Sequence, residues 1–131
     1  NERPRATVHG DLLPGNVLVR PDGTIRLIDF EFASCADPLE DFASLYLHLS
    51  RASDPPEIFL KRCLQREPTK QEICLLFVYA KLAAVGWQLW ALTKIHNGER
   101  NSLLDTYTQQ MNKFVSTVQI PAIPDDFLWR S

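Results

Sequence analysis

Residues 8–31 read VHGDLLPGNVLVRPDGTIRLIDFE, and this stretch decides the fold that we expect. Within it, two short runs rich in β-branched residues flank the turn signal Pro21-Asp22-Gly23-Thr24. Such a pattern is typical of a β-hairpin. The polar residues of the stretch gather at the open end of this hairpin, away from the turn, and they suggest chemistry rather than packing.

The register of the hairpin determines which polar residues meet. If the loop consists of the four residues 21–24, Val17 pairs with Ile28, and Asn16 faces Asp29 across the open end. An amide oxygen and a carboxylate held together suit Mg²⁺, which keeps several waters and bridges nucleotide phosphates. The spacing therefore predicts a Mg²⁺ site at Asn16 and Asp29.

Asp11 lies shortly before Asn16, in a loop that contains Pro14 and Gly15, and we expect its side chain to project toward the same end. Phosphoryl transfer needs a carboxylate that accepts or orients the proton of the substrate hydroxyl, and metal ions that neutralise the phosphates. Asp11, Asn16 and Asp29 supply this set. The H-x-D-x4-N spacing is also that of the protein-kinase catalytic loop.

Two features argue against a protein kinase: Glu31 replaces the glycine of the D-F-G triplet, and no A-P-E triplet follows. The segments 8–16 and 27–45 instead resemble the aminoglycoside phosphotransferase and choline kinase superfamily, which has a protein-kinase-like fold. ATP is the phosphoryl donor that this resemblance implies. It also implies residue roles, namely a catalytic base (Asp11), Mg²⁺ ligands (Asn16 and Asp29), an acid that assists the metal or the substrate (Glu31), and two supports of the catalytic loop (His9 and Asp41).

The apolar pattern changes to helical spacing after the hairpin, beginning at a predicted N-cap, Asp37, followed by Pro38. We expect an α+β fold: a protein-kinase-like C-terminal lobe in which the hairpin carries the catalytic and metal loops and is followed by a mainly α-helical bundle. Helices are predicted over residues 39–50, 55–64, 70–95 and 101–118, with an irregular tail over 120–131.

Eight residues precede His9, whereas the family places a nucleotide-covering loop and a phosphate-contacting lysine in an N-terminal lobe. The five glycines are scattered, so no phosphate-binding loop is found elsewhere in the chain. We therefore expect residues 1–131 to form a single C-terminal catalytic lobe, with the nucleotide lobe missing and little turnover by the chain alone. A non-catalytic binding module is the alternative from a different class.

The overall composition limits the classes of binding partner and the compartment that we expect. The net charge is −2, and the sequence contains no dense run of Lys or Arg. A nucleic acid is therefore not an expected partner. Three cysteines without a C-x-x-C pair favour the reducing cytoplasm. Residues 73–92 approach the length of a membrane span, but Lys81 and Gln88 interrupt them, which favours a buried core helix.

Trp87 and Trp90 suggest the acceptor. Their spacing on a helix brings both indoles to one face, and aromatic faces attract quaternary ammonium groups. Residues 85–114 are also similar to the C-terminal region of choline and ethanolamine kinases. We expect these tryptophans, with Glu31, to bind a small amine-bearing alcohol; thiamine or an aminoglycoside remains an alternative, as does simple core packing of the two indoles.

Overall fold

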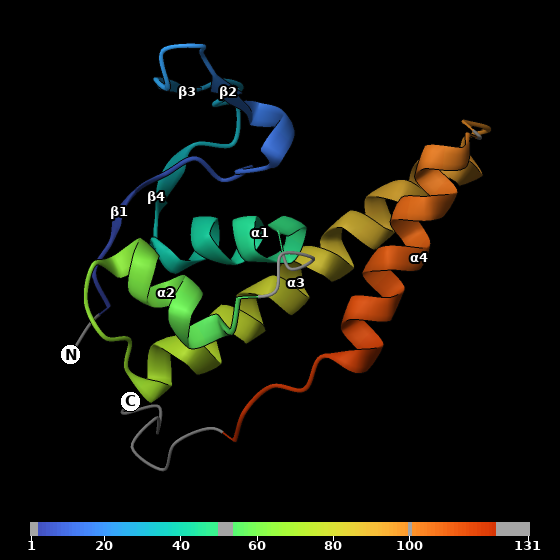
Figure 1. The fold of residues 1–131 in the computed structure, drawn as a ribbon. Coiled ribbons are helices and arrows are strands. Elements are labelled where there is room, and N and C mark those ends of the chain that lie inside the picture. Colours follow the sequence, from blue (N-terminus) through green and yellow to red (C-terminus); the bar gives the residue numbers. More distant parts are fainter. Residues whose placement is uncertain (1–2, 50–53, 100, 123–131) are drawn as a thin grey trace.

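The computed structural model describes residues 3–49, 54–99 and 101–122, and Figure 1 shows its fold. Two antiparallel strand pairs and four α-helices lie in these ranges, so the predicted α+β class is confirmed. The strands are β1 (Ala6–Val8), β2 (Val17–Val19), β3 (Ile25–Leu27) and β4 (Ser34–Ala36). The helices are α1 (Leu39–Leu49), α2 (Pro56–Leu64), α3 (Lys70–His96) and α4 (Ser102–Thr117).

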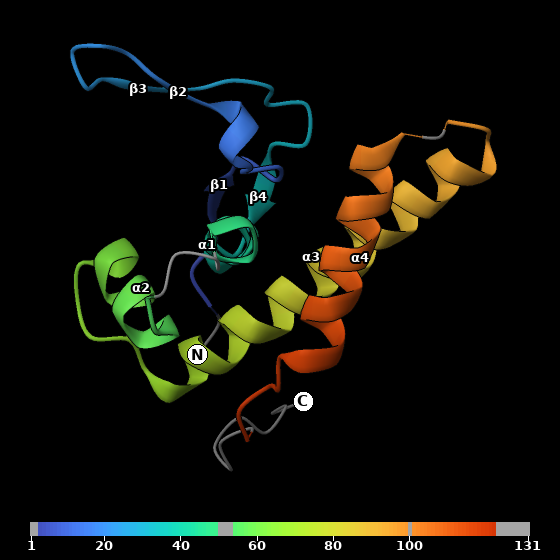
Figure 2. The ribbon, with the colours of Figure 1, turned by 45° about the vertical axis from the view of Figure 1, so that its right-hand side comes forward.

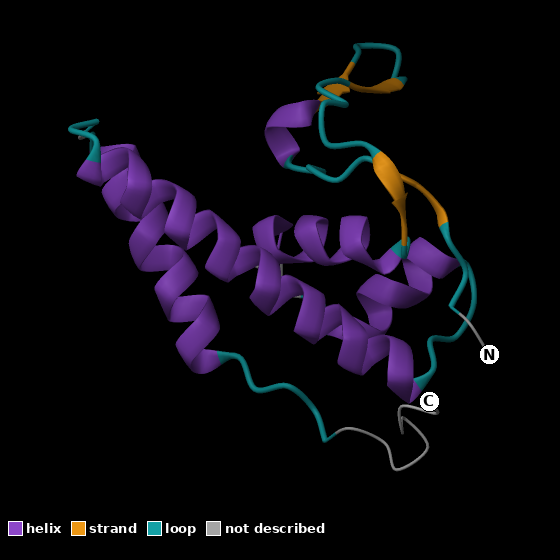
Figure 3. Ribbon diagram, turned by 180° about the vertical axis from the view of Figure 1, so that it is seen from behind, coloured by secondary structure: helices purple, strands orange, loops and turns teal. Residues whose placement is uncertain are grey.

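The long helix α3 is the centre of the helical body. It packs against α1, α2 and α4, and α4 runs back along its second half (Figures 1 and 3). Small residues, Ala80 and Ala84, lie fully buried on α3 and let the neighbouring helices approach closely. Leu47 of α1 and Met111 of α4 complete this core. Burial of these apolar side chains is the main force that holds the helices together.

Side-chain caps mark the starts of α1, α3 and α4 close to their predicted positions. Thr69 and Glu72 form a reciprocal capping box at the start of α3, and the Asn101 side chain accepts from Leu104 N at the start of α4. Asp37 Oδ1 accepts from Leu39 N at 3.0 Å, which confirms the cap predicted for α1. The predicted end of the first helix at residue 50, and residues 123–131 of the tail, lie outside the described residues.

The carboxylate of Asp37 also joins three parts of the chain. It pairs with the Arg3 guanidinium near the N-terminus and accepts from the Tyr79 hydroxyl of α3 at 3.4 Å. The hydrogen bond to Asp37 is the largest cause that raises the pKa of Arg3. Asp37 is therefore a structural residue that fixes the start of α1.

The predicted register of the hairpin is wrong by one residue. Val17 pairs with Leu27, not with Ile28, because the loop has three residues rather than four. Arg20 N donates to Thr24 O at 2.9 Å, and Gly23 has a φ of +82°, a left-handed conformation that glycine adopts without strain. Three-residue hairpin loops commonly end on such a residue.

A second strand pair, β1 with β4, was not predicted. Val8 pairs with Ser34 and Ala6 with Ala36. Each strand has only three residues, and the two lie far apart in sequence, so no local pattern marks them. This pair joins the hairpin to the helical body, from which β2 and β3 project (Figure 2).

Helix α3 is, among the described residues, long and apolar enough to cross a membrane if length and composition alone are considered. Its packing against α1, α2 and α4 is that of the core helix predicted from the sequence. Lys81 lies half-buried within it.

Glu72 is expected to make the fold acid-sensitive. The hydrogen bonds from the Arg66 guanidinium, at 2.6 and 2.9 Å, are the largest cause that lowers the pKa of Glu72 from 4.5 to about 2. A lowered pKa stabilises the fold above pH 4.5, and this stability is lost as the pH falls from 4.5 toward 2. We expect Glu72→Gln to cost about 2 kcal/mol at pH 7 and to flatten the pH dependence of urea unfolding in that range.

Glu67→Gln is the matched control for this measurement. Glu67 pairs with Lys61, but both side chains are more than half exposed, and exposed pairs contribute little. Equal losses of stability in the two variants would contradict the special role of Glu72.

Candidate active site

The loop that follows β1 is held by the first turn of α1. Asp41 Oδ2 accepts from His9 N at 2.7 Å, and Asp41 Oδ1 accepts from Gly10 N at 3.0 Å. One carboxylate therefore satisfies two consecutive backbone donors of the loop. This arrangement fixes the backbone immediately before Asp11.

The buried imidazole of His9 joins this loop to the end of the hairpin. Its Nδ1 accepts from Asp11 N at 3.3 Å, and its Nε2 lies 2.8 Å from Ile28 O. A carbonyl oxygen only accepts, so these bonds fit the tautomer with the proton on Nε2. Because both ring nitrogens are engaged by backbone groups, the ring positions the loop and leaves the chemistry to its neighbours.

Gly10 meets the backbone of the segment that follows the hairpin. Its φ is +78°, and a Cβ at this position would lie 2.3 Å from Phe32 O. No side chain larger than hydrogen fits without moving one of the two backbone segments. Glycine at position 10 therefore lets the Asp11 loop lie directly against Phe32.

Asp11 and Asn16 are in direct contact. Asn16 Nδ2 donates to Asp11 Oδ2 at 3.0 Å and to Asp11 O at 2.9 Å. An amide nitrogen is a donor and its oxygen an acceptor, so this contact leaves the Asn16 amide oxygen to face a cation. The same bonds hold the Asp11 carboxylate in one orientation.

The prediction that Asn16 faces Asp29 is wrong, because the shifted register places Ile28 opposite Asn16. Ile28 N donates to Asn16 O at 3.1 Å, and Asp29 follows directly. Asp29 has a φ of +66°, an uncommon conformation for a side-chain-bearing residue that often occurs at functional sites. It turns the chain out of the hairpin.

Asn16 and Asp29 offer an amide and a carboxylate, which are oxygen ligands of the kind that Mg²⁺ takes. In the described ranges no three His, Cys, Asp or Glu side chains group as a metal site. Mg²⁺ accepts such a sparse protein set because it retains waters and binds phosphate oxygens. Glu31 is exposed, two residues beyond Asp29.

A cavity of about 540 Å³ brings Asp11 together with both tryptophans. The indoles of Trp87 and Trp90 meet edge to face, with ring centroids 5.6 Å apart. The apolar lining also includes Phe32 and Leu82, and the remaining polar lining comes from Glu40, Ser44 and Tyr79. The tryptophans therefore belong to a cavity wall as well as to the helix packing.

Glu31 does not line this cavity, whereas Glu40 does. Sequence reasoning missed Glu40, because an acidic residue in the first turn of a helix is explained by the helix dipole alone. The one available signal was its spacing of four from Ser44, which places both on one face of α1.

A sequence profile of the phosphotransferase enzyme family matches residues 1–84. The chain belongs to this family. No curated protein sequence matches the chain closely enough to be counted as a relative.

Solved structures agree with this membership of the phosphotransferase family. A choline/ethanolamine kinase family protein from Mesorhizobium loti has a TM-score of 0.75 at 20% identity, over 97% of this chain and 42% of that one. The choline kinase LicA from Streptococcus pneumoniae has a TM-score of 0.62 at 28% identity, over 88% of this chain and 41% of that one. The predicted superfamily and its choline kinase-like branch are thereby confirmed.

A structure of LicA in complex with AMP is similar to the same part of the chain, with a TM-score of 0.61 at 28% identity over 86% of this chain and 39% of that one. The chain thus spans about two fifths of the length of these phosphotransferases.

Proposed function

We propose that the full-length protein transfers the γ-phosphoryl group of ATP to the hydroxyl of a small amine-bearing alcohol of the choline or ethanolamine type. The single observation that carries this proposal is the cavity shared by Asp11, Glu40, Trp87 and Trp90. It combines a carboxylate next to a loop that can hold a metal with an aromatic wall suited to an ammonium group.

Asp11 acts as the catalytic base. Its carboxylate accepts the proton of the substrate hydroxyl as the hydroxyl oxygen bonds to the γ-phosphorus and the bond from that phosphorus to the leaving ADP breaks. Asn16 keeps the carboxylate oriented through the 3.0 Å hydrogen bond. The 131-residue chain contributes chiefly orientation, since phosphoryl transfer requires little covalent chemistry from the protein.

Asn16 and Asp29 would hold Mg²⁺, and Glu31 would assist from the metal side or the substrate side. When bound, the ion would neutralise charge on the β- and γ-phosphates. His9 and Asp41 keep the loop in place through their hydrogen bonds to backbone groups.

Residues 1–131 form the C-terminal catalytic lobe in this proposal, and a separate nucleotide lobe completes the ATP site. Large apolar side chains on the projecting hairpin support a further contact surface there, since Leu18, Val19, Ile25 and Leu27 are all exposed. The AMP complex of a similar protein supports nucleotide binding. Three free cysteines support the cytoplasm as the compartment.

A substrate panel tests the function. The full-length protein, given ATP and Mg²⁺, is compared on choline, ethanolamine, thiamine and an aminoglycoside. We expect the highest kcat/KM with choline or ethanolamine. A preference for thiamine or an aminoglycoside would replace the acceptor but retain the phosphotransferase, whereas no transfer to any of them would favour the non-catalytic binding module.

Glu40→Gln is expected to raise the KM for choline about fivefold and to change kcat little, because the carboxylate attracts the cation without taking part in the transfer. A neutral alcohol of similar size should be unaffected. Glu57→Gln, which alters an exposed acid in the first turn of α2, is the matched control. Equal changes for the charged and the neutral alcohol would contradict an electrostatic role.

A further inference from the structure

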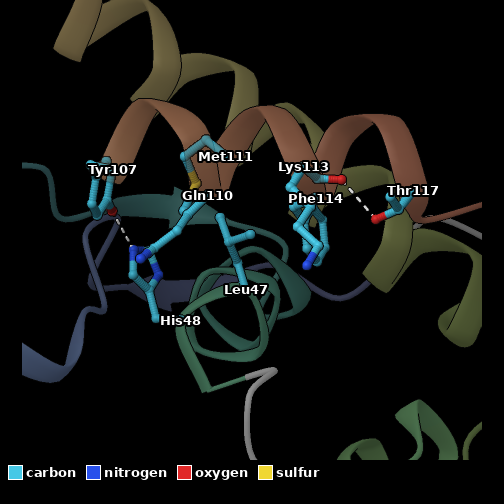
Figure 4. A pocket seen from close by; sticks show the side chains of 8 residues that line it. All are labelled: Leu47, His48, Tyr107, Gln110, Met111, Lys113, Phe114 and Thr117. Carbon is cyan, nitrogen blue, oxygen red and sulfur yellow. Dashed lines mark hydrogen bonds between the residues drawn. The ribbon is translucent and has the colours of Figure 1, made fainter. Parts of the chain in front are cut away.

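His48, near the end of α1, makes two hydrogen bonds that fix its tautomer. Its Nδ1 lies 2.8 Å from Ser44 O, and its Nε2 lies 2.5 Å from the Tyr107 hydroxyl of α4. The Ser44 carbonyl only accepts, so Nδ1 carries a proton, and in this tautomer Nε2 accepts from the Tyr107 hydroxyl. Figure 4 shows the contact between His48 and Tyr107.

The Tyr107 hydroxyl is a suitable donor for this bond. Burial, and secondly the negative charge of Asp11, raise the pKa of Tyr107 to about 12, so the phenol keeps its proton.

Tyr107 packs against the aromatic wall. Its ring meets the Trp87 indole edge to face with centroids 5.8 Å apart, and the His48 ring meets the same indole at 6.3 Å. Trp87 in turn contacts Trp90. An unbroken series of rings therefore runs from His48 to the cavity that contains Asp11.

The two hydrogen-bonded residues line a second cavity and contact Trp87, which lines the first. His48 and Tyr107 line a second cavity of about 560 Å³ between α1 and α4, together with Leu47, Gln110, Met111 and Phe114 (Figure 4). Trp87 and Trp90 line the first. Tyr107 borders the second cavity, and without the hydrogen bond to His48 its edge-to-face packing on Trp87 would restrain the ring only weakly.

We propose that His48 is a positioning residue for the acceptor site, which holds the Tyr107 ring against Trp87 and so keeps the aromatic wall in the orientation that binds an ammonium group. The inference rests on the proposed function and adds to it a residue outside the substrate cavity. His48 itself touches neither the substrate nor the reacting atoms.

Variants of the full-length protein separate this role from simple packing. His48→Phe keeps a ring but removes both hydrogen bonds, Tyr107→Phe removes only the hydroxyl, and His48→Gln offers an acceptor oxygen again. The first two should each raise the KM for choline about fivefold with kcat nearly unchanged, and the double variant should be no worse than either. His48→Gln should recover part of the loss. His96→Phe, at the exposed end of α3, is the matched control.

Two further measurements need no turnover. Nitrogen-15 NMR of the imidazole should show the Nδ1–H tautomer at His48, and Tyr107→Phe should alter that signal. Tryptophan fluorescence measures choline binding directly. The affinity for choline should fall in the same variants in which the KM for choline rises. Absence of phosphoryl transfer in the presence of such binding would defeat the proposed function alone.

Additive effects of the two single variants, an Nε2–H tautomer, or choline binding that is unchanged in His48→Phe would each overturn the inference. So would a full-length protein that binds no choline at all, because no ammonium-binding wall would then exist to be positioned.

Discussion

Asp11→Asn is expected to lower the kcat of the full-length protein by about 1,000-fold, the range typical of a lost general base. The amide has the shape of the carboxylate, and its oxygen can still accept from Asn16 Nδ2, so the loop should keep its structure. What it loses is the ability to take the proton from the substrate hydroxyl. Binding of Mg²⁺ and ATP should change little, because Asp11 is not among the proposed ligands.

The measurement is steady-state transfer to choline together with an independent nucleotide-binding titration. Asp22→Asn, at the exposed tip of the hairpin, is the control, since Asp22 accepts from the backbone N and the hydroxyl of Thr24 within the loop. Full turnover in the Asp11 variant would remove this residue from the mechanism. An equal loss of nucleotide affinity would instead make it a metal ligand.

Gly10→Ala is expected to destabilise the protein by about 2–3 kcal/mol and to reduce kcat as well. The added methyl group would lie 2.3 Å from Phe32 O, and alanine must adopt a φ of +78°, so two separate costs arise at one residue. The loop can relieve the overlap only by moving away from Phe32. Such a movement displaces Asp11 and lengthens the hydrogen bonds from the backbone to Asp41.

Two glycines in the same chain separate these costs. Gly23→Ala requires a φ of +82° but meets no atom within 4 Å, whereas Gly15→Ala has neither problem. Thermal unfolding should therefore rank the variants with Gly15→Ala least affected, Gly23→Ala intermediate and Gly10→Ala most affected. A Gly10 variant as stable and active as the Gly23 variant would contradict the close contact with Phe32.

The helices were predicted well because the residues that mark a helix, its cap and its apolar spacing, lie close together in the sequence. Helices α3 and α4 begin at the side-chain caps Thr69 and Asn101, α2 begins at a pair of prolines, and the apolar spacing continues over several turns. The hairpin was also visible, but its register was not, because Gly23 can either belong to a four-residue loop or close a three-residue one. The hydrogen bond from Arg20 N to Thr24 O decides between them.

The sequence predicted only part of the candidate site, because a local pattern can link only residues that are close together in the chain. Asp11, Asn16 and Asp29 lie within one short stretch, so spacing was sufficient to link them. Glu40 and His48 carry no such signal: each is an unremarkable polar residue on α1 until α3 and α4 pack beside it.

The amino-acid sequence by itself determined the family, the order of the helices and the short segment that contains Asp11, Asn16 and Asp29, since all of these depend on residues close together in the chain. Only the tertiary structure decided that the tryptophans of α3 share a cavity with Asp11, that Glu40 replaces Glu31 as the acid lining it, and that His48 reaches Tyr107. These contacts join segments far apart in sequence, and they form only when burial of the apolar faces of α1, α3 and α4 brings the helices together.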